Sequence, residues 1–151
     1  MKKELNHPPI NFGKTGVLII NLGTPDTTSW FDIRKYLKEF LSDKRVIEVN
    51  PIIWQIILNF FILTFRPSKT AKAYKEIWMK EENMSPLLYY TIRQTEKVSA
   101  SLSSENLVID FAMRYGNPSI KSKISKLQKE GCENLVILPL YPQYAAPTTA
   151  T

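Results

Sequence analysis

The sequence is short of the residues that build disulfides, metal sites and membrane spans. Its 151 residues include one cysteine, Cys132, and one histidine, His7, which excludes an internal disulfide and a zinc site of Cys and His ligands. His7 stands in a polar, proline-containing stretch, where we expect a solvated side chain rather than a catalytic one. The most apolar run, residues 51–65, is shorter than the roughly 20 residues that span a bilayer, and it contains Gln55 and Asn59.

Acidic residues are fewer than basic ones, 14 against 20, which gives a formal charge of +6. This excess suits an acidic ligand or an anionic membrane surface, with simple solubility as the plain alternative. No stripe of basic residues interleaved with aromatics is present, so nucleic acid is not an expected partner. Residues 1–14 lack the apolar segment of a secretory signal and predict a flexible lead-in and a cytoplasmic protein.

Apolar runs and helical periodicity alternate along the chain. Buried strands are predicted at residues 16–21, 107–113 and 135–140. Helices are predicted over residues 29–41, 67–80, 85–102 and from 120 to a stop at Gly131. Residues 46–49 are expected to be a brief extended piece, and residues 146–151 the start of a further helix. This alternation predicts an α/β fold, a Rossmann-like parallel sheet flanked by helices.

Helix caps are predicted at two places. Asp26, Thr27 or Thr28 could cap the first helix, because all three follow the turn after the first strand. Ser85 followed by Pro86 is typical of an N-cap with proline at the first helical position.

The segments that follow the three predicted strands share a composition. Ligands of open parallel sheets bind at the carboxyl ends of the strands. Here these ends, residues 22–25, 114–118 and 141–144, are rich in Gly, Pro and Tyr and carry one arginine, and no Gly-rich phosphate loop follows the first strand. Aromatic and apolar surface with a cation suits a large flat hydrophobic ring system that bears carboxylates.

The apolar run at residues 51–65 has two interpretations that the sequence leaves open. It forms either a buried helix or an exposed lip that holds an apolar ligand or enters a membrane interface. Basic residues follow at once: Arg66, Lys69, Lys72 and Lys75. Basic residues beside an apolar lip would suit anionic lipid.

Five segments together resemble bacterial ferrochelatases, in the order and spacing of that family. They are KTGVLIINLGTPD at 14–26, RPSKTAKAYKEIW at 66–78, SPLL at 85–88, AMRYGNPSI at 112–120 and LPLYPQYAAPTT at 138–149. The resemblance implies two similar Rossmann-like domains with the porphyrin in a cleft between them. Residues 15–151 would be the first domain, with the second absent and the chain truncated.

The resemblance also implies the site residues. Leu22 matches a residue against the porphyrin face, and the 51–65 run matches the apolar lip of the pocket mouth, with Trp54, Ile57 and Phe61 as contacts. The residues expected to bind substrate are Leu22, Arg66, Tyr74, Ser85, Arg114, Tyr115 and Tyr144, among which Arg66, Tyr74 and Ser85 would hold the porphyrin and its propionates.

The family's catalytic histidine and glutamate would lie beyond Thr151, so no catalytic residue and no metal site are expected in this chain. Asp26 and Asp110 are explained by a cap and a strand-edge role. Where relatives with an iron–sulfur cluster have a cysteine, this chain has Ala146, so no cluster is expected, and ferrous iron enters only as a substrate.

By this resemblance the chain is the porphyrin-binding half of a protohaem ferrochelatase and is inactive alone. The alternatives are a coproporphyrin III ferrochelatase, a non-catalytic tetrapyrrole-binding half-domain, and a structural α/β module that binds through residues 51–65. Expected partners are porphyrin, the missing C-terminal domain and the inner face of the membrane, contacted peripherally by residues 51–65.

Overall fold

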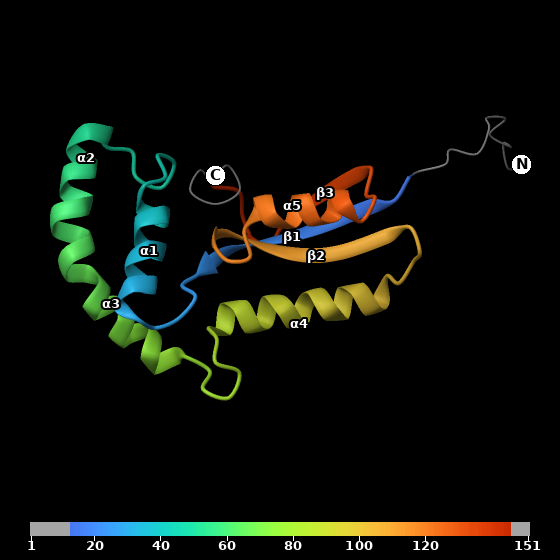
Figure 1. Ribbon diagram of the computed structural model, residues 1–151, viewed down its shortest axis with the longest axis horizontal. Coiled ribbons are helices and arrows are strands. Elements are labelled where there is room, and N and C mark those ends of the chain that lie inside the picture. Colours follow the sequence, from blue (N-terminus) through green and yellow to red (C-terminus); the bar gives the residue numbers. More distant parts are fainter. Residues whose placement is uncertain (1–12, 146–151) are drawn as a thin grey trace, which may run out of the picture.

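The computed structural model describes residues 13–145 and has a three-stranded parallel sheet at its centre (Figure 1). The strands are β1 (Thr15–Thr24), β2 (Leu107–Gly116) and β3 (Asn134–Pro139), in the order β2-β1-β3. Thr24 pairs with Gly116 and Ile20 with Pro139, so all three strands end at the same side of the sheet. The predicted α/β fold is therefore confirmed. The predictions for His7, Ala146 and a helix at 146–151 lie outside the described residues.

Two helices cover opposite faces of the sheet. α4 (Pro86–Ser101) precedes β2, and α5 (Ile120–Lys129) links β2 to β3 on the other side of β1. Because crossovers between parallel strands are right-handed, two connections that run in opposite directions place their helices on opposite faces. Figure 1 shows this arrangement, with α4 below the sheet and α5 above it.

The remaining helices form a separate lobe at the carboxyl ends of the strands. They are α1 (Trp30–Leu41), α2 (Pro51–Ile57), the π-helix η1 (Leu58–Ile62) and α3 (Leu63–Ile77). In Figure 1, α2 and α3 run beside α1 as one bent rod. We call residues 30–77 the helical lobe.

The lobe and the sheet have separate hydrophobic cores. In the lobe, the buried residues that pack together are Ile33, Leu37, Leu41, Leu58, Leu63 and Ala71. In the sheet, they are Leu18, Ile20, Ala112 and Leu127, which fill the space under α5. The two cores share no residue, so other contacts must hold the lobe against the sheet.

Several predicted boundaries are wrong for identifiable reasons. β2 continues to Gly116 because it keeps pairing with β1, so Arg114 and Tyr115 lie in the strand and not in its exit turn. Residues 46–49 form no strand, since Val46 belongs to a turn and Val49 to a bend. Ser29 caps α1, since its hydroxyl accepts a hydrogen bond from the Asp32 N–H at 3.1 Å. None of the predicted caps, Asp26, Thr27 or Thr28, is the N-cap of α1.

The helix predicted at 67–80 instead spans Leu63–Ile77, with Pro67 inside it. A proline has no N–H to donate to the carbonyl four residues earlier, here that of Leu63. The Arg34 Nε donates to this carbonyl at 3.1 Å. The side chain from α1 thus satisfies the acceptor that Pro67 leaves open, and the helix continues through the proline.

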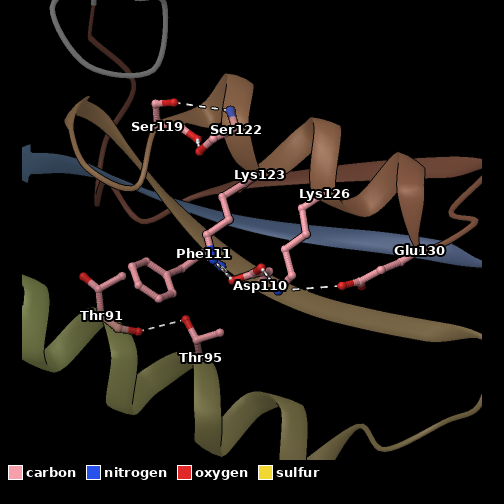
Figure 2. Close-up of polar contacts among 9 residues, drawn as sticks. All are labelled: Thr91, Thr95, Asp110, Phe111, Ser119, Ser122, Lys123, Lys126 and Glu130. Carbon is pink, nitrogen blue, oxygen red and sulfur yellow. Dashed lines mark hydrogen bonds and ion pairs between the residues drawn. The ribbon is translucent and has the colours of Figure 1, made fainter.

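A polar network joins β2 to α5 (Figure 2). The nearly buried Asp110 accepts hydrogen bonds from Lys123 at 2.6 Å and from Lys126 at 2.9 Å. Burial by itself would raise the pKa of Asp110, but the two lysines and the Phe111 N–H outweigh it and hold the pKa below its ordinary value. Asp110 therefore lies between two cations on β2, which is an edge strand of the described sheet, in keeping with the predicted strand-edge role.

Candidate functional site: an apolar hollow on the helical lobe

An open hollow of about 970 Å³ lies along η1 and α3. Its size is in the range of pockets that hold drug-sized ligands, roughly 300–1,000 Å³. It is lined by Phe61, Ile62, Phe65, Arg66, Lys69, Thr70, Ala73, Tyr74, Glu76 and Ile77. The lining thus combines aromatic and aliphatic side chains with two cations, a suitable chemistry for an apolar ligand that carries carboxylates.

The apolar run at residues 51–65 is an exposed lip and not a buried helix. Ile52, Phe60 and Phe65 are each more than 70% exposed, whereas Leu58 and Leu63 face the lobe core. One expected lip contact is placed differently. Trp54 packs against the lobe core and donates its indole N–H to the Leu41 carbonyl at 2.7 Å, so its side chain is not presented to a ligand.

Arg66 and Tyr74, two of the expected substrate-binding residues, line the same hollow. Arg66 is exposed and has no hydrogen-bond or ion-pair partner among residues 13–145. Tyr74 is half-buried, and burial raises the pKa of its hydroxyl. The Tyr74 hydroxyl therefore keeps its proton at neutral pH.

Tyr36 lies beside Tyr74 and connects the hollow to the sheet. Its hydroxyl donates to the Gly23 carbonyl at 3.2 Å, at the end of β1. Burial, and then the neighbouring Tyr74, raise the pKa of Tyr36 far above its ordinary value. The Tyr36 hydroxyl therefore stays protonated and holds α1 to this strand end.

Arg114 and Tyr115 are engaged differently from Arg66. The Arg114 guanidinium forms an ion pair with Asp43 at 2.7 Å and lies 4.7 Å from the centre of the Tyr115 ring. Tyr115 is buried, and its hydroxyl donates to the same Asp43 oxygen at 3.0 Å. The charge of Arg114 is thus largely compensated within the protein. Their expected role toward substrate stays a prediction.

The other expected site residues lie at separate places. Leu22 is half-buried near the end of β1. Ser85 is buried, and its hydroxyl accepts from the Leu88 N–H at 3.2 Å, which confirms it as the N-cap of α4. Tyr144 follows β3 and is 77% exposed. None of these three lines the hollow on the lobe, and their roles toward a ligand stay predictions.

Sequence reasoning placed Lys69 beside the lip rather than in a ligand site, and it missed Ile77 and Asp43. The places of Lys69 and Ile77 could have been found, because Arg66, Lys69, Ala73 and Ile77 follow each other at helical spacing and share one face of α3. Asp43 gave no such signal, since its partners lie more than 70 positions along the chain. In residues 13–145 no three His, Cys, Asp or Glu side chains are grouped to hold a metal ion.

Comparisons with known proteins identify the family of the chain. The model of the ferrochelatase family matches residues 14–151. A protein named ferrochelatase from Allorhizobium ampelinum is 57% identical over 96% of this chain, one from Agrobacterium fabrum is 55% identical over 97%, and one from Francisella tularensis is 53% identical over 93%. The chain belongs to the ferrochelatase family. It spans 41–43% of the length of these relatives.

Among the described residues, no helix is both long enough and apolar enough to cross a membrane.

Proposed function

We propose that this chain is the porphyrin-binding half of a ferrochelatase, an enzyme that inserts ferrous iron into protoporphyrin IX to form protohaem in haem biosynthesis. One observation carries the proposal: Arg66 and Tyr74 line one apolar hollow in a member of the ferrochelatase family. A flat macrocycle would lie against Phe61 and Phe65, and its propionates would meet the Arg66 guanidinium.

The chemistry divides between binding and proton transfer. Metallation of a porphyrin removes two pyrrole N–H protons while iron arrives, so a base is needed beside the ring. By resemblance the histidine and glutamate of the family lie beyond Thr151, and this half supplies the apolar surface and the propionate contacts. We therefore expect the chain to bind porphyrin without inserting iron.

Titration of the purified chain with protoporphyrin IX, followed by its absorbance, tests the binding role. We expect Arg66→Gln to weaken binding about tenfold, because a charge-assisted hydrogen bond is lost. Lys72→Gln is the matched control, since this exposed lysine lies on the same helix and does not line the hollow. The dimethyl ester of the same porphyrin has no carboxylates and should bind the wild type and Arg66→Gln equally.

An affinity that is unchanged in both Arg66→Gln and Tyr74→Phe would contradict the assignment of the hollow.

Comparison of protoporphyrin IX with coproporphyrin III, which carries more propionates, tests the substrate alternative. Formation of metalloporphyrin by the purified 151-residue chain with ferrous iron would overturn its expected inactivity. If no iron is inserted even after the rest of a full-length relative is supplied, the non-catalytic alternative holds.

We also propose that the exposed lip touches the inner face of the membrane peripherally. The lip places Ile52 and Phe60 in solvent, and Lys69 and Lys72 follow on α3. Sedimentation with vesicles that contain an anionic phospholipid tests this. Phe60→Ser should reduce the bound fraction, whereas vesicles of neutral lipid should bind little of either form.

A further inference from the structure

The contact surface between the helical lobe and the sheet, which we call the seam, is formed mainly by one face of α1 and by the residues that directly follow α1. Tyr36, Glu39, Phe40 and Asp43 follow each other at helical spacing and all reach the strand ends. Glu39 accepts a hydrogen bond from the Gly116 N–H at 3.0 Å, and the Phe40 ring meets that of Tyr115 edge-on at 5.1 Å. None of these four residues is in the sheet core.

Asp43 makes the shortest polar contact described at this seam. One of its carboxylate oxygens receives both the Arg114 guanidinium, at 2.7 Å, and the Tyr115 hydroxyl, at 3.0 Å. The side chains of Asp43 and Arg114 are 14% and 28% exposed, so water screens this pair less than it screens a surface pair. Asp43 also holds its own loop, since its other oxygen accepts from the Arg45 N–H at 2.8 Å.

We propose that Asp43 is a positioning residue for porphyrin binding. By fixing the exit of α1 on β2, it sets where the lobe stands on the sheet, and hence where Arg66 and Tyr74 lie relative to the strand ends. This inference rests on the proposed function of the hollow. Asp43 itself does not line the hollow, so its effect on a ligand passes through the placement of the lobe.

Two matched substitutions separate positioning from stability. Asp110→Asn removes a buried carboxylate with two cationic partners on the α5 face of the sheet, away from the hollow. Asp26→Asn removes an exposed carboxylate at the same seam, where Asp26 accepts from Asn117 and pairs with Lys35 at 3.5 Å. We expect Asp110→Asn to lower the midpoint of urea unfolding without changing affinity, and Asp26→Asn to change neither.

The test is a double-substitution cycle with protoporphyrin IX, at a temperature where circular dichroism shows every variant to be folded. We expect Asp43→Asn to weaken binding about tenfold, as for the loss of hydrogen bonds to a charged group. The cost of Arg66→Gln should fall from about tenfold to about twofold in the Asp43→Asn background, because Arg66 is then misplaced already. Asp43→Glu keeps the charge and should restore most of the affinity.

Each outcome decides the matter. An unchanged affinity in Asp43→Asn, a full cost of Arg66→Gln in that background, or an equal loss in Asp110→Asn would overturn the positioning role. If Asp43→Asn does not fold, Tyr115→Phe removes one of the two bonds and should reduce the cost of Arg66→Gln in the same way; an undiminished cost overturns the role. A wild-type chain that binds no porphyrin overturns the proposed function, and this inference with it.

Discussion

The sheet and the helical lobe use their apolar side chains in opposite ways. In the sheet, α4 and α5 cover both faces of β1, and Leu18 and Ile19 are almost fully buried. In the lobe, one side of η1 and α3 is buried through Leu58 and Leu63, while Phe60 and Phe65 stand exposed on the other. Both faces of β1 are therefore covered, whereas the lobe buries one side of η1 and α3 and leaves the other side exposed.

The junction of β1 and β2 gives the largest expected effect. Gly23 has a φ of +114°, and a Cβ there would overlap the carbonyl of Tyr115. Gly23→Ala should therefore reduce the free energy of unfolding by more than about 3 kcal/mol, measured by urea unfolding, because backbone on both strands must move. Gly131→Ala is the control, since Gly131 also has a positive φ, +81°, but a Cβ there meets no atom within 4 Å. It should cost about 1 kcal/mol.

A smaller loss for Gly23→Ala than for Gly131→Ala would mean that the sheet end tolerates movement. The seam with the lobe would then be weaker than the contacts of Tyr36 and Tyr115 indicate.

Two near neighbours in η1 test the division within the lobe. Leu58 is fully buried in the lobe core, and Phe60, two residues on, is 71% exposed. Leu58→Ala should cost about 3 kcal/mol through lost burial and the cavity it leaves. Phe60→Ala should change the free energy of unfolding by less than about 0.5 kcal/mol. Comparable losses in urea unfolding would show that the open side of the lobe also supports the fold.

Asp110 tests how far polar contacts stabilise the sheet. Its pKa is held below the ordinary value by Lys123 and Lys126 against the opposing effect of burial. This stabilisation is fully present above the unfolded pKa of about 4 and is lost as the pH falls through the lower, folded value. Asp110→Asn should cost about 2 kcal/mol at pH 7 and reduce the acid dependence of unfolding between about pH 5 and 2.

Glu130→Gln is the matched control, because Glu130 is the more exposed partner of Lys126, at 3.8 Å. It should cost less than about 0.5 kcal/mol, as for a surface pair. An acid dependence that is the same in Asp110→Asn as in the wild type would remove Asp110 from the account of stability.

How far the sequence predicts the molecule depends on how local each signal is. Ser85 and Gly131 were predicted as helix ends because the residues that define a cap lie within a few positions of each other. Pro67 was placed at a helix start, since the donation from Arg34 that lets the helix continue comes from 29 residues away. β2 was ended too early because its last residues are held by pairing with β1 rather than by their own composition.

The site follows the same rule. Arg66 and Tyr74 came from the family resemblance, and their helical spacing would have added Lys69. That Arg114 is paired with Asp43 could not be predicted, because the contact joins two segments whose approach is set by the packing of α1 on β2.

The smallest expected effect lies at β3, where the sheet behaves like the lobe. Leu135, Val136, Ile137 and Leu138 are each 42–49% exposed, and β3 is an edge strand of the described sheet. Val136→Lys should change the free energy of unfolding by less than about 0.5 kcal/mol. It should also reduce concentration-dependent association in sedimentation velocity, because a charge on an apolar edge opposes strand pairing between chains. Val108→Lys, on β2 and packed against the sheet core, should instead destabilise the fold. If Val136→Lys and Val108→Lys reduce the free energy of unfolding equally, β3 must be covered in solution. Exposed apolar surface would then be a property of the lobe alone and not of the sheet.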